Sequence, residues 1–140
     1  MADAPLTSGT PAAPLAQRIR LALTGLFIVG LFVQFYLAGR GAFGADSYAA
    51  HKDFGQILHL LTPIILLVTL VDRTTRNRVD VIHSVLLIVL FEVQFALADL
   101  KHPAVGAFHP VNALLLLGVA FSLFKRDLNA VRGRRAAPTP

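Results

Sequence analysis

The chain is too apolar for a small soluble domain, and its charge is too scattered for a nucleic-acid-binding one. Its 140 residues are 55% hydrophobic and 15% charged, with a mean hydropathy of +0.64, which exceeds what a soluble core of this size requires. The net charge is +5, but the basic residues flank apolar segments and form no stripe interleaved with aromatic residues, so no nucleic-acid partner is expected. Membrane lipids, above all anionic head groups, are the expected partners.

Four segments are long and apolar enough to cross a hydrocarbon core about 30 Å thick. They cover residues 19–38, 50–71, 79–100 and 107–124. Strands are excluded because four segments cannot close a barrel, and an open sheet edge leaves backbone groups unpaired in lipid. Short connections make each helix antiparallel to the one before it. The sequence therefore predicts an all-α, up-down bundle of four transmembrane helices at 18–126, between disordered tails at 1–17 and 127–140.

The positions of the basic residues predict that both termini are cytoplasmic. Of the 13 lysines and arginines, ten lie before the first segment, between the second and third, or after the fourth. The other three, which lie on the opposite side, are Arg40, Lys52 and Lys101. Because positive charge is retained on the cytoplasmic side, we expect a multi-pass protein of the cell inner (plasma) membrane.

The sequence contains an internal repeat at an offset of 60. Residues 28–38 read IVGLFVQFYLA and residues 88–98 read IVLFEVQFALA, with seven of the eleven positions identical. The shared VQF-x-LA carries a polar residue to the same place, as Gln34 in one copy and Gln94 in the other. This pattern predicts two helical hairpins that run the same way, related by a pseudo-twofold axis along the membrane normal.

Two histidines occupy equivalent positions in the two predicted hairpins. After the repeated segment, the connection to the next helix is two residues shorter in the second hairpin than in the first. His51 at the head of the second helix therefore corresponds to His109 at the head of the fourth. Both are expected at one depth near the outer surface, facing each other across the bundle interior. A haem held from both sides needs two such imidazoles on facing helices, which makes these two the candidate ligands of a haem iron. A histidine at a helix end can also simply cap the helix or face water, and that alternative stays open.

Small and amide side chains surround this predicted site. Gly55 and Ala113, one turn below the two histidines, leave room for a macrocycle to approach the backbone. Gln34 and Gln94, about two turns below the outer surface, would either orient a ligand histidine or hydrogen-bond across the bundle as structural contacts. Gly55 and both glutamines are therefore included among the cofactor-binding candidates.

A second polar group is predicted deeper in the bundle. At 1.5 Å per residue, His59 lies about 12 Å below His51, and Glu92 on the third helix comes out at about the same depth. Polar groups near mid-membrane are costly and often functional, so the two are expected to pair, either as a proton relay or only to satisfy each other. Pro63 removes a hydrogen bond to the carbonyl of His59, which predicts a bend there with an exposed acceptor.

The two remaining histidines give minor alternatives. His83 is a candidate for a second haem together with His59, although the two differ by about 12 Å in depth on straight helices. His102, in an outer loop, would complete a three-nitrogen site for copper, zinc or nickel with His51 and His109, or would simply be solvated. The chain has no cysteine, so thiolate ligands and disulfides are excluded.

Three stretches carry a resemblance to a known family. They are VQFYLAGRGAFG (33–44), AHKDFGQILHLL (50–61) and FHPVNALLLLG (108–118). The chain resembles a family of small four-helix bacterial membrane proteins, common in actinobacteria and of unknown function, over nearly all of residues 18–124. The resemblance implies the fold and marks His51, Pro110 and Asn112 as landmark positions, but it implies no mechanism.

The chain is also loosely similar to membrane b-type cytochromes, in which four helices clamp haem with histidines. Those proteins typically carry two histidines a dozen or more residues apart on one helix, one for each haem. Here the spacing between His51 and His59 is eight. The similarity implies a haem b site, and this departure in spacing favours one haem near the outer side rather than two.

We expect a small integral membrane cytochrome of b type that transfers electrons, either alone or as a component of an oxidoreductase. Its partner would be a quinone or another redox protein, and a homodimer stays open. One alternative is a transport component for metal ions or small solutes, with the outer histidines as its entry site. The other is a non-catalytic accessory subunit of a membrane complex, whose polar residues are helix contacts only.

Overall fold

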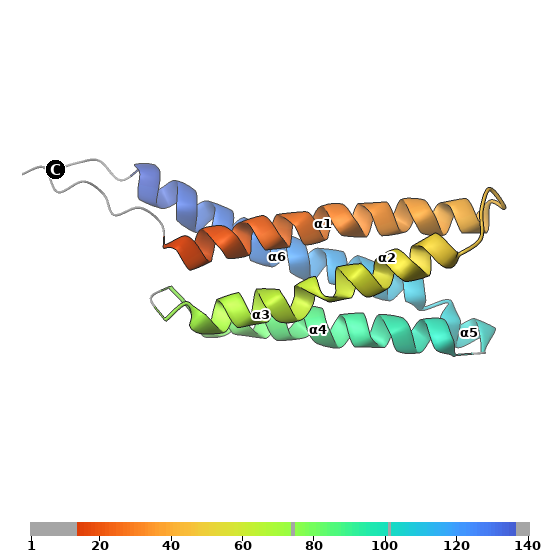
Figure 1. Ribbon diagram of the computed structural model, residues 1–140. Coiled ribbons are helices and arrows are strands. Elements are labelled where there is room, and N and C mark those ends of the chain that lie inside the picture. Colours follow the sequence, from red (N-terminus) through yellow and green to blue (C-terminus); the bar gives the residue numbers. More distant parts are fainter. Residues whose placement is uncertain (1–13, 74, 101, 137–140) are drawn as a thin grey trace, which may run out of the picture.

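The computed structural model describes residues 14–73, 75–100 and 102–136, and within these residues it contains helices and no strand. The helices, in chain order, are α1 (Leu15–Ala42), α2 (Ala49–His59), α3 (Leu61–Val71), α4 (Arg78–Asp99), α5 (Pro103–Gly106) and α6 (His109–Ala136). Figure 1 shows them as a bundle of long, roughly antiparallel rods. The prediction of an all-α fold is confirmed.

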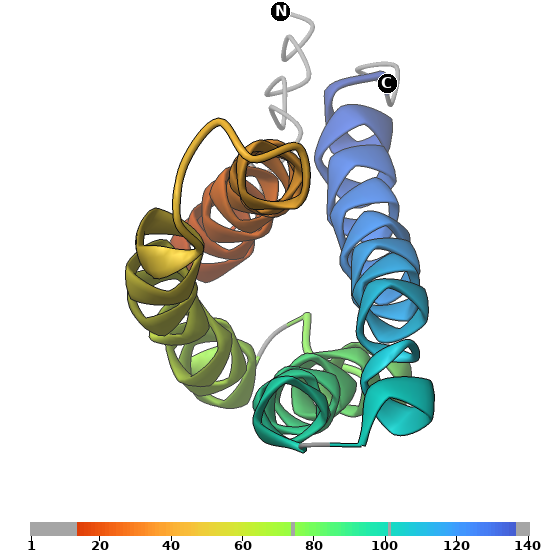
Figure 2. The same ribbon diagram turned by 90° about the vertical axis from the view of Figure 1, so that its right-hand side faces the viewer.

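Four helical stretches are long and apolar enough to span a membrane. They are Leu15–Ala42, Ala49–Val71, Arg78–Asp99 and Pro103–Gly133, of which the second combines α2 with α3 and the fourth combines α5 with α6. Viewed from one end, they follow one another around a ring, and α6 closes the ring by lying beside both α4 and α1 (Figure 2). The prediction of four helical segments long and apolar enough to span a membrane is confirmed.

Two helices extend beyond their predicted ends in the structure. α1 begins at Leu15, within the predicted tail at 1–17, and α6 runs to Ala136, well beyond the predicted end at 124. Each extension carries a residue that is buried in the bundle, Gln17 on α1 and Val131 on α6. Residues 127–136 are therefore helical and not a disordered tail, while residues 1–13 and 137–140 lie outside the described residues.

The bend predicted at Pro63 is present as a break between α2 and α3 (Figure 1). Leu60 separates the two helices, and its amide donates to the carbonyl of Ile57 at 3.2 Å in a tighter, three-residue turn. The carbonyl of His59 accepts a hydrogen bond from the Thr62 hydroxyl at 3.0 Å. This corrects the expectation of an exposed acceptor, because the side chain of Thr62 replaces the amide that Pro63 lacks.

Equivalent positions of the two halves of the chain contribute to one buried core. On α1 and α4, the buried residues 60 apart are Arg20 and Asp80, Thr24 and Ser84, Phe27 and Leu87, and Leu31 and Phe91. Across α2, α3 and α6, the buried residues 58 apart are Leu58 and Leu116, Thr62 and Ala120, Ile65 and Leu123, and Thr69 and Asp127. The second offset is two residues smaller than the first because the connection between the two helices is two residues shorter in the second hairpin.

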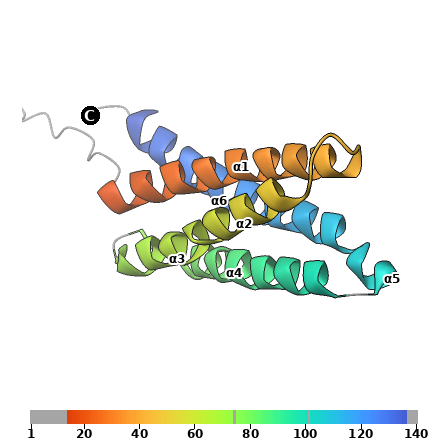
Figure 3. The same cartoon turned by 45° about the vertical axis from the view of Figure 1, so that its right-hand side comes forward.

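The two ends of the bundle differ in character. The α1–α2 loop and α5 lie at one end, called here the α5 end, and the start of α1 and the end of α6 lie at the other, called the terminus end (Figure 3). At the terminus end, Arg20 donates to Asp127 through Nε at 2.9 Å and Nη2 at 2.5 Å, and to Asp80 at 3.3 Å. All three side chains are buried, so an ion-pair network ties α1, α4 and α6 together at this end.

Candidate functional site

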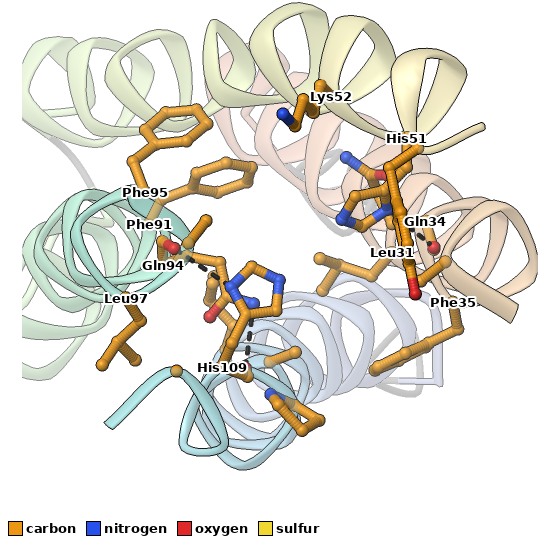
Figure 4. Close-up of a pocket in the computed structure, with 18 of the residues that line it drawn as sticks. Leu31, Gln34, Phe35, His51, Lys52, Phe91, Gln94, Phe95, Leu97 and His109 are labelled. Atoms are coloured by element: carbon orange, nitrogen blue, oxygen red, sulfur yellow. Dashed lines mark hydrogen bonds between the residues drawn. The ribbon is translucent and has the colours of Figure 1, made fainter. Parts of the chain in front are cut away.

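A cavity of about 710 Å³ opens between the helices at the α5 end. Its lining comes from α1, α2, α4, α5 and α6, and much of it is apolar or aromatic, including Leu31, Phe35, Phe91 and Phe95. His51 and His109 also line it, and Figure 4 shows their rings in the space between the helices. We call it the histidine cavity.

The rings of His51 and His109 face each other as the repeat predicts. Their centroids lie 6.0 Å apart, with an angle of 64° between the ring planes, and both residues are half-buried. One metal atom bound on opposite sides by a nitrogen of each ring at about 2.0 Å places the two ring centroids about 6 Å apart. The separation of the two rings is compatible with such an arrangement.

Each of these rings is fixed by a matching hydrogen bond. Nδ1 of His51 lies 3.2 Å from the carbonyl oxygen of Gln34, and Nδ1 of His109 lies 3.1 Å from that of Gln94. A carbonyl only accepts, so Nδ1 carries a proton in both rings, and in a neutral ring Nε2 then presents its lone pair. Among the described residues, neither Nε2 has a hydrogen-bond partner. This is the tautomer and anchoring that metal-binding histidines usually show.

The two glutamine side chains have different surroundings. The Gln94 amide donates to the carbonyl of His109 at 2.9 Å and accepts from Asn112 Nδ2 at 2.5 Å, and Asn112 also donates to the carbonyl of Leu90 at 2.8 Å. Gln94 is thus a structural contact between α4 and α6. By contrast, Oε1 of Gln34 is buried without a partner in the described part of the chain. The backbone carbonyls, not the amide side chains, orient the histidines.

Gly55 keeps the wall of the cavity open near His51. A Cβ atom at this position would lie 2.7 Å from Nε2 of Gln34, which is closer than such atoms approach. Both Gly55 and Ala113, its counterpart 58 residues later, line the histidine cavity. Their role in making room for a macrocycle stays a prediction.

His59 and Glu92 pair as expected, but on a different side of the helices. Nε2 of His59 lies 2.8 Å from Oε1 of Glu92, and the two side chains are 24% and 59% exposed. Glu92 does not line the cavity. The expected position inside the bundle below a macrocycle is therefore corrected, because α4 turns Glu92 outward while its neighbour Phe91 is buried.

His83 and His102 lie away from the cavity. Nδ1 of His83 contacts the carbonyl of Val79 at 2.7 Å, and its Nε2 contacts the Ser122 hydroxyl at 2.9 Å, so it links α4 to α6. His102 is exposed and precedes α5. In the described ranges, no three His, Cys, Asp or Glu side chains gather as a metal site. The grouping of His102 with His51 and His109 is therefore not found among these residues. His59 and His83 contact different partners, Glu92 and the Ser122 hydroxyl, and a second haem between them stays a prediction.

The buried network of Arg20, Asp80 and Asp127 was not predicted from the sequence. Arg20 served there only as one of the positive charges that indicate the orientation in the membrane. The signal was available, since Arg20 and Asp80 occupy the same position in the two copies of the repeat and carry opposite charges. A second, polar cavity of about 400 Å³ adjoins this network, lined in part by Asp80, Arg126 and Asp127. Oε1 of Gln17 and Nη1 of Arg20 are buried without partners among the described residues.

Half of the chain matches a known family. Residues 34–104 match the sequence model of DUF6220, a family of unknown function. The chain belongs to this family. The matched part of the DUF6220 protein contains His51, Gln34, Gln94 and Gly55 of the histidine cavity, whereas His109 follows it.

The expected membership of a small family of unknown function is confirmed. Searches of the curated proteins and of the solved structures found no significant match. The similarity to membrane b-type cytochromes thus stays a prediction.

Proposed function

We propose that this DUF6220 protein is a small membrane cytochrome of b type, which holds one haem between His51 and His109 and transfers electrons. One observation carries the proposal. The two rings come from different halves of the chain, lie 6.0 Å apart, and are each anchored through Nδ1 with Nε2 free of protein partners in the described residues.

The residues present fit a haem. The donor set is two neutral imidazoles, which suits iron in a b-type site. The cavity volume of about 710 Å³ lies within the roughly 300–1,000 Å³ typical of cofactor sites. Lys52 also lines the cavity and offers its ammonium group to a carboxylate of the porphyrin.

A bound haem supplies one-electron chemistry, and the protein supplies position and surroundings. His51 and His109 hold it, and the carbonyls of Gln34 and Gln94 fix the direction of each ring. The apolar walls exclude water, which keeps the local dielectric low and so influences the reduction potential. Gly55 leaves the space that a side chain would fill.

The proposal includes an origin and an orientation for the fold. We infer that the bundle is a duplicated hairpin with a pseudo-twofold axis along the membrane normal, supported by the matching buried positions at offsets of 60 and 58. Both termini are cytoplasmic and the membrane is the plasma membrane, supported by the ten basic residues on that side. The histidine cavity then opens toward the outer face.

An absorption spectrum of protein purified from haem-sufficient cells tests the proposal. We expect a Soret band that shifts on reduction and is lost in His51→Ala and in His109→Ala. His83→Ala and His102→Ala are matched controls that remove a histidine away from the cavity, and both should keep the band. Colourless protein with bound zinc or copper would instead favour metal transport, and protein with neither would favour an accessory subunit.

A further inference from the structure

The pair formed by His59 and Glu92 is an unusual group for a surface that faces lipid. Glu92 is the only glutamate in the chain, and its side chain is 59% exposed. It lies seven residues from Asp99, the last residue of α4, which places it about 10 Å into the helix from the α5 end. An ionisable side chain at such a depth is costly and marks a functional site unless something covers it.

The carboxylate of Glu92 has capacity for one more hydrogen-bond donor. Its Oε1 is 2.8 Å from Nε2 of His59, and no other polar contact to it is formed within the described part of the chain. Its neighbours along α4, Val89 and Val93, are exposed and apolar, and so are Ile57 and Leu60, which lie next to His59 in the sequence. An occupant therefore has to be soluble in the membrane and has to donate a hydrogen bond to a carboxylate.

The pair shares a wall with the histidine cavity. The ring of His59 packs against Phe91 with centroids 5.2 Å apart and against Phe95 with centroids 5.3 Å apart. Both phenylalanines also line the histidine cavity, and both are labelled in Figure 4. A compound bound at Glu92 would thus be separated from the cavity by His59 and these two aromatic rings.

We propose that Glu92 and His59 bind the hydroxyl-bearing head of a lipid-soluble quinol from within the membrane. The hydroxyl hydrogen is the donor that the carboxylate lacks, and the isoprenoid or alkyl tail of such a compound remains in lipid. A second copy of this chain is a poorer occupant, because the same surface would bring another carboxylate and apolar side chains. The choice of a redox-active lipid rests on the proposed cytochrome function, whereas the binding site itself does not.

Carbodiimide labelling of the whole protein in phosphatidylcholine nanodiscs tests this site. Dicyclohexylcarbodiimide dissolves in the membrane, and a protonated carboxyl group adds to it without a leaving group, so one labelled residue gains the mass of one reagent. We expect Glu92 to be labelled, as read by mass spectrometry of peptides. Glu92→Gln should not be labelled at this position, and Asp53→Asn, which removes an exposed carboxylate near the α5 end, should behave as the native protein.

Protection by a quinol gives the decisive readout on the native protein, so it does not depend on how any variant folds. A decyl-substituted benzohydroquinone at about ten times its dissociation constant should slow the labelling of Glu92 about tenfold, since only about a tenth of the sites are then free. The matched dimethoxy compound has the same ring and tail but no hydroxyl hydrogen, and it should not protect. Equal protection by both compounds, or by neither, would overturn the proposal.

Two further outcomes would also contradict the proposed quinol site. If Glu92 is not labelled at all, lipid-soluble compounds do not reach the pair. If labelling increases when the protein is diluted to one copy per nanodisc, a second copy and not a quinol covers the site. A haem spectrum of the same sample separates the two proposals: haem without quinol protection ends the quinol site alone, and protection without haem ends the cytochrome alone.

Discussion

Nδ1 of His51 contacts the backbone carbonyl of Gln34 at 3.2 Å, and the equivalent atom of His109 repeats this contact with Gln94 at 3.1 Å. The first helix of each half thus fixes the histidine of the second. This arrangement explains why two imidazoles from distant parts of the chain meet at one level.

Gly55→Leu should block the histidine cavity while leaving the bundle folded. Even a Cβ atom here would lie 2.7 Å from Nε2 of Gln34, so a leucine displaces that amide and projects into the space proposed for the cofactor. Haem and the leucine would then overpack the same space, at a cost of about 1–3 kcal/mol that falls on the haem-bound state and corresponds to a roughly fivefold to 150-fold loss of haem affinity. Haem titration measures the effect. Gly118→Leu is the control, because Gly118 has open space around it, and a similar loss in that variant would disprove the explanation.

Gly30→Ala should weaken the packing of α1 against α2. A Cβ atom at Gly30 would lie 2.3 Å from Cδ1 of Leu58, and both residues are buried. We expect the free energy of unfolding in detergent to fall by about 1–3 kcal/mol, since the leucine has to move within a filled core. Gly118→Ala should instead be neutral or raise it by about 0.4–1 kcal/mol. Equal stability of the two variants would contradict the close contact.

Arg20→Met should strongly destabilise the terminus end. The variant leaves Asp127 buried without the two bonds that Arg20 donates to it, while Asp80 retains Arg126 at 2.8 Å. Breaking a buried ion pair in this way costs about 3–5 kcal/mol. Thermal unfolding of the purified protein measures the change.

The compensating variant shows whether the charge itself is responsible. Arg20→Met combined with Asp127→Leu removes both members of the pair and should recover most of the lost stability, because apolar replacements of buried ion pairs are often tolerated. Arg18→Met changes an exposed residue and should stay within about 0.5 kcal/mol of the native protein. A double variant as unstable as the single one would show that packing, not charge, sets the cost.

Single cysteines should report the proposed orientation, since the native chain contains none. Ser47 is exposed in the α1–α2 loop, and Gly133 is exposed on α6 at the terminus end, so each is replaced by cysteine in a separate variant. In intact cells, we expect a membrane-impermeant maleimide to label Ser47→Cys and to label Gly133→Cys only after permeabilisation. The reverse pattern would mean that both termini lie outside the cytoplasm.

The sequence by itself determined where the helices run and which residues share a depth. Length and apolar composition predict the four spans, because a helical segment of about 20 apolar residues is long enough to cross lipid and satisfies its own backbone hydrogen bonds there. The repeat predicts that His51 and His109 lie at one level, and the helical rise predicts that His59 and Glu92 meet. Each of these rests on position along a helix axis, which residue number fixes.

The tertiary structure decided which way each side chain turns about its helix. The sequence did not predict that Glu92 faces outward, or that Arg20 reaches Asp127, 107 residues later. In water, an apolar stripe tells which face of a helix is buried, but lipid is as apolar as the core, so that signal is weak in a membrane span. The orientation of each helix is set by packing and hydrogen bonds with its neighbours, and these exist only once the helices are assembled.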